Sequence, residues 1–190
     1  CALPISTCVS TSASGIVTLD PLPTVTVNSP TVCQGQSATV TATPGAAGTY
    51  SYVWTVPALA TAPGNVASFP TTVAGTYSVV ITNTVTTCVS LSASGTVTLD
   101  LLPTVTVNSS TVCDGQPTTV TATPGAPGTY SYAWTGPITI GNVASFTTTV
   151  AGTYSVVITN TVTNCVSASA SGTVTLDSTP TVVVNSPTVC

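Results

Sequence analysis

Apolar and polar residues alternate with a period of two along most of the chain, and no segment shows helical periodicity. In SATVTAT (37–43) alanine and valine share one face while threonine occupies the other. TYSYVWT (49–55) and GTYSVVIT (75–82) alternate in the same way. Turn-forming pairs interrupt the pattern at Pro44-Gly45, Pro63-Gly64, Ala74-Gly75 and Ser94-Gly95. Roughly five to seven short strands in about 80 residues predict an all-β fold made of two packed sheets.

The alternation also predicts the core. Trp54 and Tyr77, with their counterparts Trp134 and Tyr154, are expected to be buried. Val66 and Phe69 are expected to begin the strand region that follows Trp54. The other residues predicted to share inward faces are Val25, Val27, Ala38, Val40, Ala42, Tyr50, Tyr52, Val79, Ile81, Val97 and Leu99.

An internal repeat determines the predicted domain organisation. Residues 23–55 recur at 103–135 with 27 of 33 positions identical, and residues 64–100 recur at 141–177 with 34 of 37 identical. Between them VPALATAP becomes GPITI, and such a change of length is typical of a surface loop. The predicted parts are the tail fragment of a repeat at 1–22, full repeats at 23–102 and 103–179, and a first-strand fragment at 180–190.

The composition removes most catalytic chemistry. The chain has no Lys, Arg or His, and its net charge of −4 comes from four aspartates, Asp20, Asp100, Asp114 and Asp177. Without an imidazole base, an amine nucleophile or a cationic clamp, we expect no enzymatic activity and no cofactor. The same lack of basic residues argues against binding to nucleic acid or anionic lipid. No apolar run approaches the roughly 18 residues that a membrane helix needs, so membrane insertion is not expected.

Seven cysteines form no CxxC pair and have no histidine partner, which argues against a zinc site. In a Thr- and Ser-rich chain they indicate disulfides formed in an oxidising, extracellular compartment, with free cytosolic thiols as the alternative. The disulfide candidates within the repeats are Cys33, Cys88, Cys113 and Cys165. The fragments hold Cys1, Cys8 and Cys190, which have no complete repeat to supply a partner and are candidates for bridges between chains.

Two further features resemble a known fold. Trp54 lies twelve residues after Ala42, and AGTYSV (74–79) follows near the end of the repeat. This resembles the immunoglobulin pattern of a core tryptophan on strand C and a tyrosine corner leading into strand F. Where antibody-type domains carry their inter-sheet cysteines, this chain has Ala42 and Val79.

The series VCxG, YxW, AGTYSVVIT, Cys and TVTLD, together with the linker PLPTVTV, is similar to the immunoglobulin-like repeats of large Bacteroidota cell-surface proteins. This resemblance implies tandem immunoglobulin-like β-sandwiches in an exported adhesin, gliding-related protein or fibre-forming protein, often secreted through the type IX system.

Two cysteine pairings stay open at this point. Each repeat carries one VCxG cysteine and one after the tyrosine-corner strand, so the simplest pairing is within repeats, Cys33 with Cys88 and Cys113 with Cys165. In an ordinary immunoglobulin strand order, however, these positions lie near opposite ends of the sandwich. A bridge between neighbouring domains, such as Cys33 to Cys165, would then form more easily.

Two other features have both a binding interpretation and an ordinary one. The aromatic residues of the YxW strands could form a sugar-binding platform, but their period-two spacing favours core packing. Asp20, Asp100 and Asp177 end the last strand of their repeats, where an interdomain calcium site is one interpretation. Because no cluster of oxygen ligands surrounds them in sequence, a strand-ending turn residue is favoured, and no metal site is predicted.

Two short motifs suggest glycosylation. Asn108-Ser109-Ser110 fits the N-glycan sequon, and Asp177-Ser178-Thr179 is similar to the short O-glycosylation motif of Bacteroidota. The glycosylation candidates are therefore Asn108 and Ser178.

Together these features predict a non-enzymatic structural protein that builds an extracellular filament from domains placed end to end. The linkers between repeats are short and contain proline, which restricts hinge motion. The low charge opposes association between chains only weakly. One alternative is the stalk of a bacterial surface adhesin, and another is a carbohydrate-binding module that would bind surface glycans.

The two fragments predict how chains associate. Each has one apolar face, formed by Val17 and Leu19 in residues 8–20 and by Val182 and Val184 in residues 180–190. Unpaired strands of this kind accept partner strands, so strand exchange would give a head-to-tail homopolymer. The alternative is that this chain is a window cut from one longer polypeptide.

Overall fold

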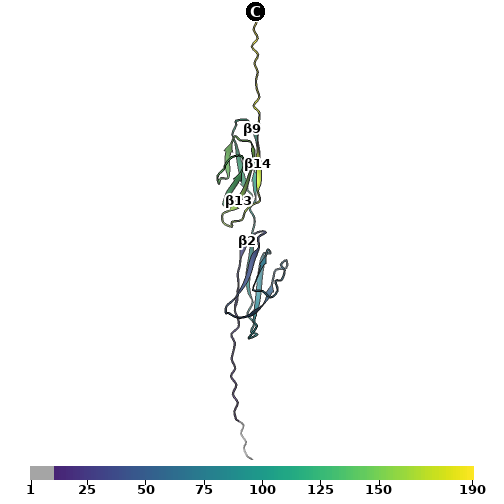
Figure 1. Cartoon of the computed structure of the whole chain (residues 1–190), viewed down its shortest axis with the longest axis vertical. Coiled ribbons are helices and arrows are strands. Elements are labelled where there is room, and N and C mark those ends of the chain that lie inside the picture. Colours follow the sequence, from purple (N-terminus) through teal and green to yellow (C-terminus); the bar gives the residue numbers. More distant parts are fainter. Residues whose placement is uncertain (1–10) are drawn as a thin grey trace, which may run out of the picture.

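The structure is a computed structural model that describes residues 11–190, and within them the chain forms two β-sandwiches. No helix occurs in this part of the chain. Figure 1 shows the sandwiches one after the other along a single line, with extended segments before the first and after the second. The strands of the first are β1 (Val25–Val27), β2 (Thr31–Cys33), β3 (Ala38–Pro44), β4 (Tyr50–Thr55), β5 (Ser68–Thr71), β6 (Gly75–Asn83) and β7 (Ala93–Asp100).

The second sandwich repeats the same strands in the same order. They are β8 (Val105–Val107), β9 (Ser110–Cys113), β10 (Thr118–Pro124), β11 (Tyr130–Thr135), β12 (Ser145–Thr148), β13 (Gly152–Asn160) and β14 (Ala170–Asp177). The all-β prediction is confirmed, because the alternating segments form strands, and the breaks at Pro44-Gly45, Pro63-Gly64 and Ala74-Gly75 lie at or between strand ends. The break predicted at Ser94-Gly95 was wrong, because both residues lie inside β7, where the glycine leaves room for the backbone carbonyl of Asn28.

Each sandwich has a three-stranded and a four-stranded sheet. In the first sandwich the orders are β1-β3-β5 and β2-β7-β6-β4, and in the second they are β8-β10-β12 and β9-β14-β13-β11. All pairings are antiparallel except β2 with β7 and β9 with β14, which are parallel. The chain therefore changes sheets between β1 and β2, so residues 23–33, which correspond to the predicted first-strand fragment at 180–190, are divided between the two layers.

Asn28 holds the chain at this change of sheet. Its side-chain amide donates to the carbonyl oxygen of Thr39 at 2.9 Å, and its Oδ1 accepts from the backbone N–H of Thr41 at 2.7 Å. Asn108 makes the same two bonds in the second sandwich, to Thr119 and Thr121. An asparagine side chain can bond to one donor and one acceptor of a neighbouring strand at the same time. The backbone groups of β3 therefore stay hydrogen-bonded where the chain leaves the sheet.

The core lies between the two sheets and has two clusters in each sandwich. The inward-facing alternation predicted for β3 and β6 is confirmed, with exposed fractions of 0–3%. In β7 Val97 is 2% exposed, whereas Leu99, near the end of the strand, is half-buried. The buried residues of the first sandwich are Ala38, Val40, Phe69, Tyr77 and Val97 in one cluster and Ala42, Val79 and Ile81 in the other. Ala42 and Val79, at the positions of the antibody disulfide, thus fill that space with hydrocarbon.

Two details of the predicted core were wrong. Trp54 and Trp134 are half-buried, unlike the fully buried Tyr77 and Tyr154. Each indole lies at the edge of the core, where its Nε1–H donates at 2.8 Å to the carbonyl oxygen of Val66 or Val143. A tryptophan N–H needs such an acceptor, which keeps that side of the ring near the surface.

The strand region after Trp54 also begins later than predicted. Val66 is 39% exposed and precedes β5, whose inward residue is Phe69. The ring of Phe69 packs edge-on against Trp54, with centroids 5.0 Å apart, and it also contacts the ring of Tyr77.

The tyrosine corner ties the start of β6 to the chain before it. The hydroxyl of Tyr77 donates to the carbonyl oxygen of Val73 at 2.8 Å and lies 2.8 Å from the hydroxyl of Thr71. Tyr154 makes the equivalent bonds to Val150 and Thr148. Because Tyr77 is fully buried, water cannot replace these partners.

We expect Tyr77→Phe to lower the free energy of unfolding of the first sandwich by about 1–3 kcal/mol, because the Val73 carbonyl loses its buried donor. Urea titration followed by tryptophan fluorescence measures this change. Tyr50→Phe is the matched control, because the Tyr50 hydroxyl bonds to Ala46 near the surface, and this change should cost less than about 0.5 kcal/mol. Equal losses in the two variants would contradict a structural role for the corner.

Candidate functional site

A disulfide joins the two sandwiches. Cys33, the last residue of β2, is bonded to Cys165, which lies 132 residues further along the chain in the loop after β13, with the two Cα atoms 5.5 Å apart. The two pairings within a repeat are absent, since Cys88 and Cys113 are free thiols. The simplest pairing considered from sequence was therefore wrong, and the bridge between neighbouring domains is the one that the structure contains.

Strand order explains this pairing. β2 runs parallel to β7, with Cys33 opposite Asp100, so Cys33 lies at the end of the first sandwich where the chain leaves it. The loop that holds Cys88 follows β6, which runs antiparallel to β7 and therefore ends at the opposite end of the sandwich. Cys33 and Cys88 are separated by the length of the domain, whereas the corresponding loop of the second sandwich faces Cys33.

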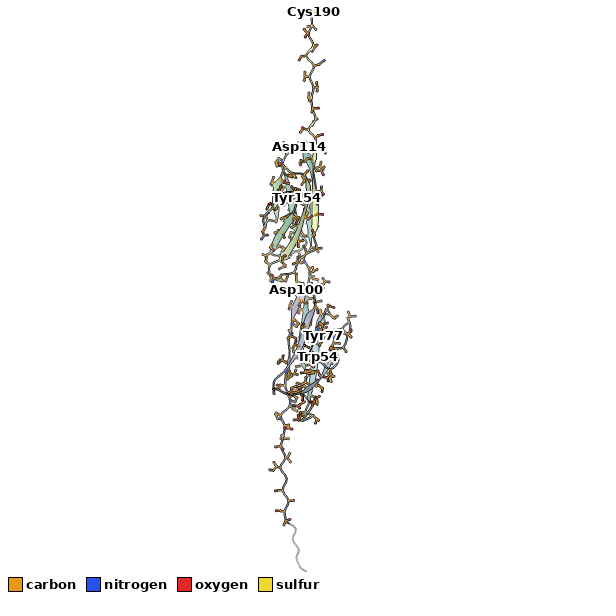
Figure 2. All side chains as sticks on the ribbon, in the orientation of Figure 1. Trp54, Tyr77, Asp100, Asp114, Tyr154 and Cys190 are labelled. Atoms are coloured by element: carbon orange, nitrogen blue, oxygen red, sulfur yellow. A yellow bond between two sulfur atoms is a disulfide. The ribbon has the colours of Figure 1, made fainter. Side chains whose placement is uncertain are left out.

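The disulfide and the linker lie next to each other at the same end of the first sandwich. The backbone N–H of Gln34 donates to the carbonyl oxygen of Asp100 at 2.8 Å, which holds the chain after Cys33 against the end of β7. Figure 2 shows Asp100 at the junction, where residues 101–103 begin the connection to the second sandwich. No hydrogen bond found among residues 11–190 crosses between the sandwiches, so the linker and the disulfide are two adjacent covalent connections.

The loop that presents Cys165 is a tight turn organised by Asn160. The Oδ1 of Asn160 accepts from the backbone N–H groups of Val162 and Thr163, at 2.9 and 3.2 Å. The Asn160 backbone donates to the carbonyl oxygen of Cys165 at 2.9 Å, and its own carbonyl accepts from Asn164. Asn164 has a φ of 60°, a left-handed conformation that asparagine tolerates better than most residues. These bonds fix the direction of the Cys165 backbone.

Cys33 is presented by a turn of a different kind. The N–H of Gln36 donates to the carbonyl oxygen of Cys33 at 2.9 Å, and Gly35 has a φ of 85°, which glycine adopts without steric cost. The VCxG motif thus has a conformational explanation, because its glycine closes the turn directly after the cysteine. Both cysteines were predicted as disulfide candidates, but the role of Asn160 was not predicted, although the repeated ITNTVT is typical of a turn that an asparagine caps.

Two of the three aspartates predicted to end strands do so, and Asp20 does not, because no strand forms in residues 11–22. Asp100 is the last residue of β7 and Asp177 the last of β14, and each offers its backbone carbonyl to the residue after a VCxG cysteine. Asp20 is exposed in the extended segment before the first sandwich. Within the described part of the chain, no three His, Cys, Asp or Glu side chains gather where they could hold a metal ion.

The aromatic residues of the YxW strands face the core. Tyr50, Tyr52 and Trp54 are half-buried and pack against the cluster of Ala42, Val79 and Ile81. Tyr130, Tyr132 and Trp134 do the same in the second sandwich. Because the rings are partly covered by residues of both sheets, they do not form a flat open platform.

The glycosylation candidates lie on the surface. Ser178 is exposed in the segment after β14, and Asn108 is exposed although both ends of its amide are engaged with β10. Glycosylation at either residue stays a prediction.

We expect Asn108→Ala to lower the free energy of unfolding of the second sandwich by about 1–2 kcal/mol, because Thr119 and Thr121 each lose a hydrogen-bond partner. Thermal unfolding followed by circular dichroism measures the loss. Gln116→Ala is the control, since Gln116 is also exposed and its side chain makes none of the hydrogen bonds found in the described residues. A neutral Asn108→Ala would show that the change of sheet does not depend on this amide.

The remaining candidate cysteines lie in the end segments. Cys1 and Cys8 fall outside the described residues, and Cys190 is an exposed free thiol. Residues 11–22 and 178–190 are extended and contain no strand. Their apolar side chains are open to solvent, with exposed fractions of 87% for Val17, 92% for Leu19, 85% for Val182 and 80% for Val184.

Among the described residues, no helix has the length and apolar character needed to cross a membrane.

Comparison with known proteins supports the fold. No protein-family model and no curated protein matches the chain. Among solved structures, the I67–I69 fragment from the titin I-band is similar over 84% of this chain and 67% of its own, with 15% identity and a TM-score of 0.50. The E-to-A variant of the same titin domains gives 14% identity and a TM-score of 0.48, and covers 82% of this chain and 66% of its own.

A third similar structure, immunoglobulin domains 1–4 of Sidekick-1, has 12% identity and a TM-score of 0.42, with 83% of this chain and 49% of its own covered. The chain spans about two thirds of the length of the titin fragments. At these identities the likeness concerns the fold. The chain is a tandem of immunoglobulin-like β-sandwiches.

Proposed function

We propose that this chain is a mechanical element of an extracellular filament, in which immunoglobulin-like repeats, with boundaries near 23–102 and 103–179, are joined end to end. The observation that carries the proposal is the pair of covalent connections at the junction, the linker at 101–103 and the disulfide between Cys33 and Cys165. A single flexible linker lets two domains swing freely, whereas two adjacent connections restrict bending and resist extension. A linear array built in this way transmits force along its length.

Several features support an exposed structural role. The chain has no Lys or Arg, so it offers no site to proteases that cleave after basic residues. A disulfide between domains persists in an oxidising compartment, which supports a secreted or cell-surface location. The sequence resemblance to repeats of Bacteroidota surface proteins points in the same direction. The exposed apolar end segments support self-association of the chain head to tail by strand exchange.

Electron microscopy of the native material tests this proposal. We expect continuous filaments with a regular axial repeat of one domain length. Isolated beaded stalks that end in a larger domain would contradict the filament and establish the adhesin stalk instead. Small-angle X-ray scattering of the purified chain adds a second test, since an elongated two-domain particle is expected and a compact particle would contradict the rod.

A further inference from the structure

The two free cysteines of the sandwiches occupy the same positions in the repeat as the two bonded ones. Cys113 ends β9 as Cys33 ends β2, and Cys88 follows β6 as Cys165 follows β13. The bonded pair therefore consists of the VCxG cysteine of one repeat and the post-β13 cysteine of the next. The free pair consists of one cysteine of each of these two kinds, the VCxG cysteine of the second repeat and the cysteine after β6 of the first.

Cys113 is held in the same geometry as Cys33. It lies opposite Asp177 in a parallel pairing, as Cys33 lies opposite Asp100. The N–H of Asp114 donates to the Asp177 carbonyl at 2.8 Å, the distance found for Gln34 and Asp100. The turn after it is also the same, with a φ of 81° at Gly115.

Cys88 likewise has the geometry of Cys165. Asn83 organises its loop through bonds to Val85 and Thr86 at 2.9 and 3.2 Å, equal to those of Asn160. The residue before the cysteine, Thr87, has a φ of 62°. This value is close to the φ of 60° at Asn164, although a left-handed conformation is costly for a β-branched residue such as threonine. The loop therefore has the same shape as the bonded loop, even without a bridge.

The free cysteines also lie at opposite ends of the two-domain unit. Figure 1 shows β9 at the end of the second sandwich away from the junction, and Figure 2 shows Asp114, the neighbour of Cys113, at that same end. Cys88 lies at the far end of the first sandwich, because β6 ends opposite to the junction. Cys113 is exposed and Cys88 half-buried, while the bonded Cys165 is fully covered, so each free thiol is open to a partner.

We propose that Cys113 and Cys88 are the forward and backward halves of a repeating interdomain bridge, each pairing with a neighbouring repeat of this same kind. Cys113 bonds to the post-β13-type cysteine of the following repeat, and Cys88 bonds to the VCxG cysteine of the preceding one. The inference rests on the proposed function, because it requires an array, and it adds that every junction is closed covalently by one rule of connectivity.

The bond forms by thiol–disulfide exchange with a disulfide oxidant, either a small molecule or a protein. The thiolate of Cys113 attacks the oxidant's S–S bond and releases one oxidant thiolate. The thiolate of the neighbouring repeat then attacks the mixed disulfide at the Cys113 sulfur and releases the second. The oxidant takes up the two electrons, and the protons lost by the two cysteines go to its two released thiolates.

The test extends the full chain by one domain, with residues 1–177 followed directly by residues 101–190, so that Leu101 follows Asp177 as it follows Asp100. Cys1, Cys8 and Cys190 are replaced by serine. The added domain carries Asn164→Thr as a mass label, since repeat 1 has threonine at that position. The protein is refolded in a buffer of reduced and oxidised glutathione, digested with pepsin without reduction, and mapped by mass spectrometry.

We expect one peptide pair that joins Cys33 to Cys165 and a second that joins Cys113 to the labelled Cys165 of the added domain. The first pair reports that the molecule is folded and oxidised. A sample with the first pair formed and Cys113 free, or with Cys113 bonded within its own domain, would overturn the inference. A Cys113→Ser variant should leave the labelled cysteine free, and Cys88→Ser should change neither pair.

The same sample separates the inference from the proposed function. If X-ray scattering finds a three-domain rod but Cys113 is free, the repeating bridge fails and the rod stands. If the labelled bridge forms but the particle is compact, the rod fails and the rule of connectivity stands.

Discussion

Removal of the interdomain bridge by the double substitution Cys33→Ser and Cys165→Ser should destabilise both sandwiches and release the hinge between them. The bridge closes a loop that contains most of both domains. In the chain-entropy description, a loop of this length contributes about 5 kcal/mol when both domains unfold. Because Cys33 lies beside Asp100, where the linker begins, the bridge also closes a shorter loop when one domain unfolds alone. That loop contributes about 4 kcal/mol.

Urea titration followed by tryptophan fluorescence measures the stability, since each sandwich has one tryptophan. Small-angle X-ray scattering measures the hinge, and the distribution of maximum dimensions should broaden in the double variant. Cys88→Ser is the matched control, because it removes a thiol from the same loop position without breaking a bridge. Unchanged stability and scattering in the double variant would show that the linker alone defines the junction.

The second large effect is expected at Gly172. This residue lies in β14, next to Asn108, where the chain changes sheets between β8 and β9. A Cβ at this position would collide with the backbone carbonyl of Asn108. The colliding atom belongs to the backbone, and Asn108 is held by two hydrogen bonds to β10, so it cannot move aside cheaply. We expect Gly172→Ala to lower the free energy of unfolding of the second sandwich by about 3 kcal/mol.

Gly141→Ala is the control for this change. Its Cβ would meet no atom within 4 Å, and its φ does not lie in the left-handed region, so its stability should stay within about 0.5 kcal/mol of the parent. The equivalent Gly95→Ala should destabilise the first sandwich by a similar amount, because its Cβ would meet the carbonyl of Asn28 in the same way. A tolerated alanine at both strand positions would show that β14 and β7 do not need this close approach.

Several structural roles could not be found from sequence, because the residues concerned act through neighbours that are brought to them by the fold. Gly172 sits in a strand where a glycine weakens packing, and only the approach of Asn108, 64 residues earlier, explains it. The asparagines of the loops were visible as repeated letters, yet their role depends on backbone groups that the turn brings within reach. The half-burial of Trp54 likewise depends on an acceptor, the Val66 carbonyl, supplied by a loop.

Alternation and internal similarity were enough to predict most of the strands, the repeat and the centre of the core. Successive side chains of a strand point to opposite faces of the sheet, so the burial of Val40, Tyr77 and Val97 could be predicted from alternation alone. The cysteine pairing, in contrast, depends on the arrangement of the strands in space. A disulfide needs two Cα atoms within a few ångströms, and that distance depends on which end of a sandwich each strand reaches. Parallel pairing of β2 with β7 places Cys33 at the exit of its own domain, next to Cys165 of the following one.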